Sequence, residues 1–242
     1  MPPLMYSRPL IKLSGEALMG SGQYGIDMDA LDAIAVDLAG VSRLGVRAAV
    51  VVGGGNIFRG VSGAAGGMDR VKADFMGMLA TVINGLALAE ALERHGQSSA
   101  IYSGLPAPTV CKAFSRDEVR RDLDEGRVAV LAGGTGNPFF TTDTTAALRA
   151  AELGCDVILK ATQVDGIYSE DPKTNPGAER FTHLTFSEVL SRDLKVMDAA
   201  AIALARDTGI PIVVFSLRET GAIGKVMRGE AVCSVVGSGG AA

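Results

Sequence analysis

The stretch Pro9-Leu10-Ile11-Lys12-Leu13-Ser14-Gly15 is a short apolar run in which a lysine and a glycine close the pattern. A second stretch, Asp156-Val157-Ile158-Leu159-Lys160-Ala161, repeats this arrangement later in the chain. Short runs rich in β-branched residues and leucine, bounded by glycine or polar residues, are typical of buried parallel strands. The two stretches therefore predict two strands of a parallel sheet, each with a lysine near its carboxyl end.

A lysine at the end of a buried strand is costly unless its ammonium group reaches a counter-charge. In open α/β sheets, ligands bind beyond the carboxyl ends of the strands. Lys12 and Lys160 together therefore indicate a polyanionic ligand that lies across those ends. The alternative is that both side chains extend into water, and that interpretation would be preferred for a single lysine.

Strand-like and helix-like segments alternate along the whole chain. Strands are predicted at 10–13, 47–52, 99–102, 128–132, 157–161, 212–215 and 232–236. Helices are predicted at 29–44, 68–95, 116–125, 144–153, 198–208 and 223–227. This alternation predicts an α/β fold, a three-layer αβα sandwich with a mostly parallel central sheet. No linker or low-complexity stretch divides the chain, so we expect one catalytic domain over residues 1–242.

The overall composition argues against several classes of protein. A formal charge of −4 disfavours broad nucleic-acid binding, which needs a basic face. Cys111, Cys155 and Cys233 are scattered without metal-ligand spacing, which fits a reducing cytoplasm and predicts no structural metal site. The first residues lack the apolar core of a signal peptide. By its sequence, no run approaches the length of a membrane span, so we expect no membrane association.

The predicted helix 68–95 is unusual because it is apolar on nearly every side. Between Phe75 and Ala91 the polar exceptions are Thr81, Asn84 and Glu90. A helix of this kind must be buried on most faces. It either packs against a second copy of itself, which we favour, or forms a central core helix covered by its own domain.

Two glycine-rich loops follow predicted strands. In the first, Gly53-Gly54-Gly55 precedes Arg59, so backbone N–H groups can approach a ligand and a guanidinium can clamp phosphate oxygens. In the second, Gly133-Gly134-Thr135-Gly136 leads through Phe139 and Phe140 into a helix, and a helix amino terminus favours anions. The alternative for the glycine triplet taken alone is a plain tight turn. Helix capping would explain Thr142 and Asp143, but not the whole second loop.

With these motifs in view, the chain resembles the bacterial uridylate (UMP) kinases of the amino acid kinase family. The resemblance covers nearly the whole chain, and its most specific block is Gly134-Thr135-Gly136-Asn137-Pro138-Phe139-Phe140-Thr141-Thr142-Asp143. The other matching blocks are 12–17, 53–60, 76–81, 159–162, 164–166 and 194–198. There is no GxxxxGK(S/T) motif, so a P-loop nucleoside triphosphatase is excluded.

The resemblance implies transfer of the ATP γ-phosphoryl group to UMP, with Mg²⁺, in a cytoplasmic homohexamer that serves pyrimidine nucleotide biosynthesis. It implies that Lys12, Lys160, Asp143 and Arg59 are catalytic. The ATP side would comprise Lys12, Leu13, Ser14, Gly15, Gly55, Arg59, Thr162, Tyr168 and Asp171. The UMP side would comprise Gly54, Asp74, Thr135, Gly136, Asn137, Pro138, Phe139, Phe140, Thr141 and Thr142.

Within that resemblance, Lys12 and Lys160 would neutralise charge on the transferred group while Asp143 orients them. Asp74 would hold the ribose hydroxyls, and Asp198 would support the site. Mg²⁺ would be held by phosphates and water, so no protein metal site is expected. Two alternatives stay open: a kinase of the same fold that acts on a carboxylate or carbamate, and a binding or storage assembly without turnover.

Many members of this family resemble one another in having a GTP effector site near the subunit junction, built partly from basic residues on and after the long helix. By block alignment, three of these positions hold Ala89, Glu93 and Ala100 here, and only Arg127 remains basic. We therefore expect weak or altered activation by GTP, unless Arg94 or His95 substitutes from a neighbouring face.

Overall fold

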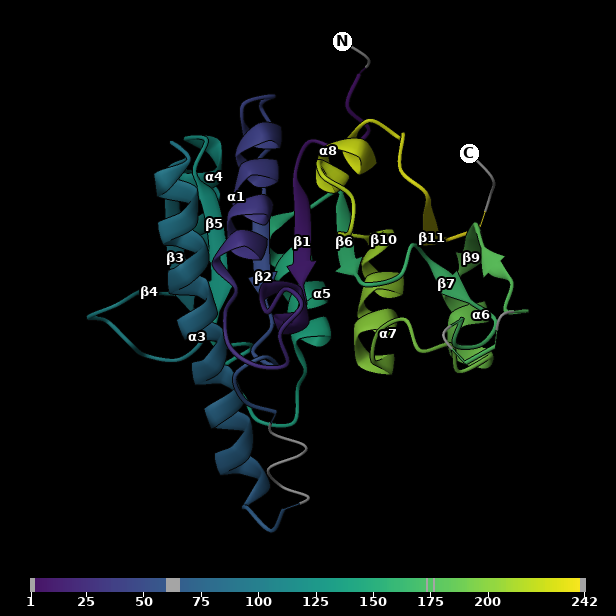
Figure 1. The fold of residues 1–242 in the computed structure, drawn as a ribbon, viewed down its shortest axis with the longest axis horizontal. Coiled ribbons are helices and arrows are strands. Elements are labelled where there is room, and N and C mark those ends of the chain that lie inside the picture. Colours follow the sequence, from purple (N-terminus) through teal and green to yellow (C-terminus); the bar gives the residue numbers. More distant parts are fainter. Residues whose placement is uncertain (1–2, 60–65, 173, 176, 240–242) are drawn as a thin grey trace.

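The computed structural model describes residues 3–59, 66–172, 174–175 and 177–239. Its centre is a sheet of strand order β4-β3-β5-β2-β1-β6-β10-β11-β9, in which every pair is parallel except β10 with β11 (Figure 1). The strands are β1 (Pro9–Leu13), β2 (Ala49–Val52), β3 (Ser99–Ser103), β4 (Lys112–Ala113), β5 (Val128–Ala132), β6 (Val157–Thr162), β9 (His183–Thr185), β10 (Ile212–Ser216) and β11 (Cys233–Gly237). A separate antiparallel pair joins β7 (Ile167–Tyr168) to β8 (Arg180–Phe181).

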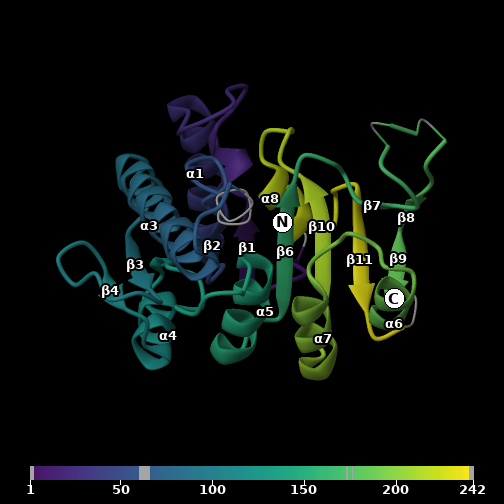
Figure 2. The same cartoon turned by 90° about the horizontal axis from the view of Figure 1, so that it is seen from below.

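Helices cover both faces of this sheet, as Figure 2 shows. One layer holds α1 (Met28–Ser42), α3 (Arg70–Arg94) and α8 (Ala222–Met227). The other holds α4 (Arg116–Asp124), α5 (Thr142–Leu153) and α7 (Ala199–Thr208), with α6 (Phe186–Ser191) near β9. A short 3-10 turn, η1 (Gly15–Leu18), follows β1. The predicted three-layer αβα sandwich with a mostly parallel sheet is confirmed.

The two cores arise from the alternation of side chains along the strands. In β1, Ile11 and Leu13 pack under α1, α3 and α8, whereas Leu10 packs in the layer of α5 and α7. Lys12 lies two residues after Leu10, so its side chain is on the same face of β1 and points into the layer of α5. Lys160 lies two residues after Ile158 in β6, so its side chain is on the same face as Ile158 and lies in that layer too.

Each predicted strand and helix corresponds to an observed one. The elements that escaped prediction are the short ones, such as β4, β7, β8, β9 and α6. Helix α5 begins at Thr142 rather than Thr144, because the Thr141 hydroxyl caps it by accepting from the N–H groups of Asp143 and Thr144. The capping role considered for Thr142 and Asp143 therefore belongs to Thr141.

The expectation that no segment approaches the length of a membrane span is wrong by length and composition. Helix α3 is 25 residues long and apolar enough to qualify. About half (56%) of the apolar 18-residue part of α3 is buried inside the molecule, because one side of the helix packs on the sheet and on α1. Core helices of soluble proteins can be equally long and apolar, so the length and composition of α3 are weak evidence for a membrane span.

The opposite side of α3 carries an exposed apolar stripe. It comprises Phe75, Met76, Leu79, Ile83 and Leu86, and Leu79 and Ile83 are each 51% exposed. Residues spaced by three or four lie on the same face of a helix. In the part of the chain that the structure describes, the fold covers only one face of α3, so the interpretation of α3 as a core helix covered by its own domain does not describe it.

Candidate functional site

The two lysines singled out by the sequence lie side by side. Strands β1 and β6 pair in parallel, and their register places Lys12 directly opposite Lys160. Lys12 is only 7% exposed, so its side chain does not extend into water. The alternative in which both lysines reach solvent is therefore wrong.

Asp143, in the first turn of α5, lies between the two ammonium groups. Its Oδ1 is 3.0 Å from Nζ of Lys12, and its Oδ2 accepts a hydrogen bond of 2.9 Å from Nζ of Lys160. Burial raises the pKa of Asp143, but the two lysines outweigh burial and hold this pKa below its usual 3.8. The cluster is therefore two cations around one ionised carboxylate, with a net positive charge.

Lys160 has a further partner, because its ammonium group also donates to the backbone carbonyl of Val196. Burial lowers the pKa of Lys160 below its usual 10.5, and the nearby Asp143 only partly opposes this effect. Two desolvated cations with one counter-charge form a site that favours an additional anion.

A cleft of about 810 Å³ opens from this cluster along the carboxyl ends of β1, β2 and β6. That volume is within the range of small-molecule sites. Eight of the nine residues predicted for the ATP side line the cleft: Lys12, Ser14, Gly15, Gly55, Arg59, Thr162, Tyr168 and Asp171. The ninth, Leu13, has its side chain fully buried in the core below.

Only some of the residues predicted for the UMP side line this cleft. Gly54 and Thr142 line it, whereas Asp74 and residues 135–141 do not. Those residues come together beside it: Asp74 Oδ2 accepts a hydrogen bond of 2.8 Å from the N–H of Phe139. Asp74 also accepts from Nε of Arg70, whose guanidinium lies 5.5 Å from the centre of the Phe139 ring.

Phe139 has an unusual backbone conformation, with φ of 72°. Non-glycine residues rarely adopt positive φ, and such strain is concentrated at binding and catalytic sites. The side chains of Phe139 and Phe140 are 65% and 54% exposed. Among the described residues, the loop therefore leaves both aromatic rings largely exposed.

The first glycine loop packs too closely for larger residues. A Cβ on Gly53 would lie 2.8 Å from the N atom of Gly15, and one on Gly15 would lie 2.7 Å from the N atom of Gly55. Arg59 lies at the edge of the cleft, where it pairs with Glu16 and donates to the carbonyl of Gly55 at 3.2 Å. Gly60, which closes the matching sequence block, lies outside the described residues.

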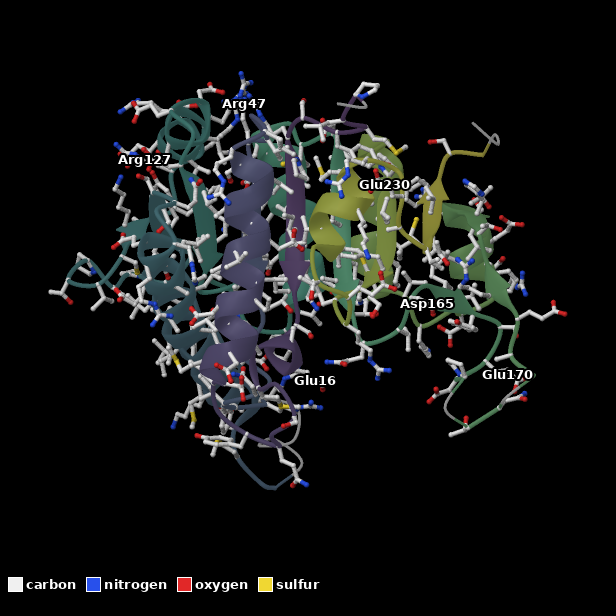
Figure 3. All side chains as sticks on the ribbon, turned by 45° about the horizontal axis from the view of Figure 1, so that its top comes forward. Glu16, Arg47, Arg127, Asp165, Glu170 and Glu230 are labelled. Atoms are coloured by element: carbon white, nitrogen blue, oxygen red, sulfur yellow. The ribbon has the colours of Figure 1, made fainter. Side chains whose placement is uncertain are left out.

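The far side of the cleft is made by the segment after β6. Thr162 Oγ1 donates to the carbonyl of Val164 at 2.7 Å, and the Tyr168 hydroxyl donates to Asp165 at 2.7 Å. Figure 3 shows Glu16 and Asp165 toward the same end of the molecule, whereas Arg127 and Glu230 lie toward the other.

Sequence reasoning missed the part of the site contributed by residues 192–196, which line the cleft. The block 194–198 was noticed, but only Asp198 received a role. Asp198 caps α7 by accepting from the N–H of Ala201 at 2.8 Å, and it accepts from the hydroxyls of Thr141 and Thr144. It thus ties the amino terminus of α5 to that of α7.

No group of three or more carboxylate, histidine or cysteine side chains gathers to hold a metal within the described part of the chain. Both oxygens of Asp143 face lysine ammonium groups. This donor set suits an anion rather than a bare cation. A divalent ion fits here only if phosphate oxygens and water supply its ligands.

The sequence profile of the amino acid kinase family matches residues 7–216. The chain belongs to the amino acid kinase family. Two relatives within this family are the uridylate kinases of Paramagnetospirillum magneticum and Brucella abortus. Each is 55% identical to this chain over 231 residues, which is 96% of either protein.

Two solved structures of this family have the same architecture. The UMP kinase from Bacillus anthracis superposes with a TM-score of 0.93 at 37% identity, over 97% of both chains. The UMP kinase from Ureaplasma parvum gives a TM-score of 0.91 at 36% identity, over 96% of this chain and 99% of that one. The resemblance drawn from the sequence blocks is confirmed.

Proposed function

We propose that this protein is a UMP kinase, which transfers the γ-phosphoryl group of ATP to UMP and yields ADP and UDP. The observation that carries the proposal is the cluster of Lys12, Lys160 and Asp143 at the head of a cleft that the first glycine loop lines with Gly53, Gly54 and Gly55. The chain also shares more than half of its residues with uridylate kinases over nearly its whole length.

The donor, ATP, is assigned to the cleft. Its phosphates would lie against the backbone of Gly15 and Gly55, with Arg59 at the rim, and its nucleoside would lie toward Thr162, Tyr168 and Asp171. We assign no contact to the Leu13 side chain, because it is buried below the cleft.

The acceptor, UMP, is assigned to Asp74, Gly54 and the loop from Thr135 to Thr142. Asp74 already holds this loop at Phe139, so a carboxylate aimed at the ribose hydroxyls would share its oxygens with the loop. The exposed rings of Phe139 and Phe140 offer apolar faces to a pyrimidine.

Transfer of a phosphoryl group needs positioning and neutralisation of charge more than covalent help. Lys12 and Lys160, held on adjacent strands, would stabilise negative charge on the moving group from two sides. Asp143 would fix both ammonium groups without forming a bond to substrate. Mg²⁺ would enter with the triphosphate and screen its charge, with no carboxylate cage from the protein.

The wider setting is also part of this proposal. We propose that residues 1–242 form one catalytic domain that works in the cytoplasm, free of membrane and nucleic acid, and supplies pyrimidine nucleotides. The exposed stripe on α3 would pack against the same stripe of a second copy, within a hexamer. Burial of that stripe is the reason for expecting an oligomer.

The alternatives differ in the acceptor or in the absence of turnover. ADP release is measured with ATP and, in separate reactions, UMP, CMP, dCMP, acetylglutamate and carbamate. The proposal expects release with UMP well above the other acceptors, and loss of that release in Lys160→Ala. A preference for acetylglutamate or carbamate would overturn it in favour of a different kinase. ATP binding without release would indicate a binding protein.

A further inference from the structure

Helix α3 carries two buried polar side chains in a segment that is otherwise apolar, and the proposed chemistry does not use them. Thr81 is 3% exposed and Asn84 is fully buried, whereas the third polar exception, Glu90, faces solvent. A buried polar side chain is costly unless it is hydrogen-bonded, so each one calls for a specific partner.

Thr81 binds the second glycine loop. Its Oγ1 accepts a hydrogen bond of 2.7 Å from the N–H of Gly133 and donates one of 2.7 Å to the carbonyl of Met78. Gly133 begins the loop that runs to Asp143. The hydroxyl therefore fixes the start of the proposed UMP loop to a rigid helix.

Asn84 binds the first glycine loop. Its Nδ2 donates to the carbonyl of Gly53 at 2.7 Å and to Oδ1 of Asn56 at 2.7 Å. Asn56 returns a hydrogen bond to Asn84 and donates another, of 2.7 Å, to the carbonyl of Gly25. Every amide hydrogen of this buried pair thus has a partner, and a satisfied network of this kind rigidifies its surroundings.

The packing around this network leaves little room for the loops to shift. A Cβ on Gly54 would lie 2.7 Å from the carbonyl oxygen of Gly77 on α3, and one on Gly15 would lie 2.5 Å from Oδ1 of Asn56. The Gly54 backbone therefore rests directly on α3, and the turn after β1 rests on the amide pair.

We infer that Thr81 and Asn84 are positioning residues that set the two glycine loops relative to each other. Thr81 fixes the acceptor loop that begins at Gly133. Asn84 fixes the loop 53–55 and, through Asn56, the turn at Gly15. Gly15 and Gly55 are the residues assigned to the donor phosphates. This inference rests on the proposed function for the naming of the two loops. Three residues apart, the two side chains lie on the same face of α3, so one helical turn fixes the spacing of both loops.

The experiment compares Thr81→Val and Asn84→Ala with the wild type in steady-state kinetics, varying ATP and UMP in turn. Loss of a single hydrogen bond predicts a three- to tenfold or so effect. We expect Thr81→Val to raise KM for UMP while KM for ATP stays near normal. We expect Asn84→Ala to lower kcat/KM for ATP more than for UMP. Thr81→Ser, which keeps the hydroxyl, restores the wild-type KM for UMP.

Leu88→Ala is the matched control, because Leu88 is fully buried on the same helix and its side chain has no hydrogen-bonding group. It should lower the melting temperature and leave both KM values unchanged. The inference is overturned if Leu88→Ala gives the same kinetic pattern, if Thr81→Ser does not rescue, or if either variant affects both substrates equally.

If Asn84→Ala does not fold, the double variant Asn56→Ala/Asn84→Ala replaces it under the same criteria, since it leaves neither amide unpaired. Calorimetric titrations with ATP and with UMP separate this inference from the proposed function. A wild type that binds both nucleotides without turnover would contradict the kinase assignment, while unequal losses of binding in the variants would still support the positioning roles.

Discussion

At the scale of single residues, the cluster around Asp143 predicts what happens when either of its two lysines is removed. Removing either lysine leaves one ammonium group paired with one carboxylate, so the remaining charges stay balanced. We expect Lys12→Ala and Lys160→Ala each to lower kcat by about a hundredfold or more, because a preorganised charge is lost at the transition state. Circular dichroism and thermal melting should show folded protein. Near-normal kcat in either folded variant would contradict the catalytic role.

The lowered pKa of Lys160 predicts the pH dependence of the reaction. The group loses its proton as pH rises through a pKa that lies below 10.5, and the positive charge needed for phosphate is then lost. We expect kcat/KM for ATP, which reports on the free enzyme, to fall on the alkaline side before pH 10.5. In Lys160→Arg, whose guanidinium stays charged, that limb should move to higher pH. An unmoved limb would assign it to another group.

Asp74 predicts a separation of the two substrates. Asp74→Asn should weaken UMP binding and largely spare ATP, because Asp74 contacts the acceptor loop and lies outside the cleft. The expected loss is at most a few kcal/mol, the worth of hydrogen bonds to a charged group. Calorimetric titration measures both affinities. Lost ATP affinity with retained UMP affinity would reverse the assignment of the two sides.

At the scale of elements, the exposed stripe on α3 predicts the route of self-association. We expect the wild type to be an oligomer at micromolar concentration and Ile83→Lys to dissociate it, since a buried charge without a partner opposes the contact. Val232→Lys is the control, because Val232 is a comparably exposed apolar residue (58%) far along the chain from α3. Light scattering gives the masses. A monomeric wild type, or equal dissociation by both variants, would exclude this interface.

Long elements were predictable from the sequence because their periodicity extends over several turns or a whole buried strand. Helix α3 and strand β5 are examples, and β5 matches its predicted bounds at both ends. Strands such as β4 and β7 contain two residues each, too few to show any period. They form because neighbouring segments offer unpaired backbone groups, and that information is tertiary.

The candidate site was predictable to a similar degree. Strand-end lysines and glycine loops leave a pattern in the sequence, and the two lysines and the first glycine loop line the cleft. The contact of Lys160 with the Val196 carbonyl leaves no pattern in the sequence, because every residue type carries a backbone carbonyl oxygen. Thr81 and Asn84 stood out as polar residues in an apolar helix, but only the structure shows that they bind the two loops.

At the scale of the whole molecule, the surface that would receive a GTP effector is poor in available cations. Ala89 and Ala100 are buried, and the Arg127 guanidinium pairs with Asp122 and Glu125 at 3.2 Å each. Arg94 and His95, the possible substitutes, both contact Asp32.

We therefore expect little activation by GTP, because an anionic triphosphate would have to displace these carboxylates. The measurement is initial rate against GTP concentration at subsaturating UMP. A several-fold activation at micromolar GTP would show that an effector site exists despite these replacements.

The position of β11 between β10 and β9 has a consequence for how the protein folds during its synthesis. Strand β9 pairs with β11 in the described sheet, yet a ribosome makes β9 well before β11, with α6, α7, β10 and α8 in between. A nascent chain can assemble the sheet from β4 through β10 as it emerges, since early segments fold first. Strand β9, which leads through α6 to the cleft wall at 192–196, gains its partner in the sheet only when β11 arrives. A chain truncated ahead of β11 would therefore lack the strand that joins β9 to β10, and β9 would remain without its partner in the sheet.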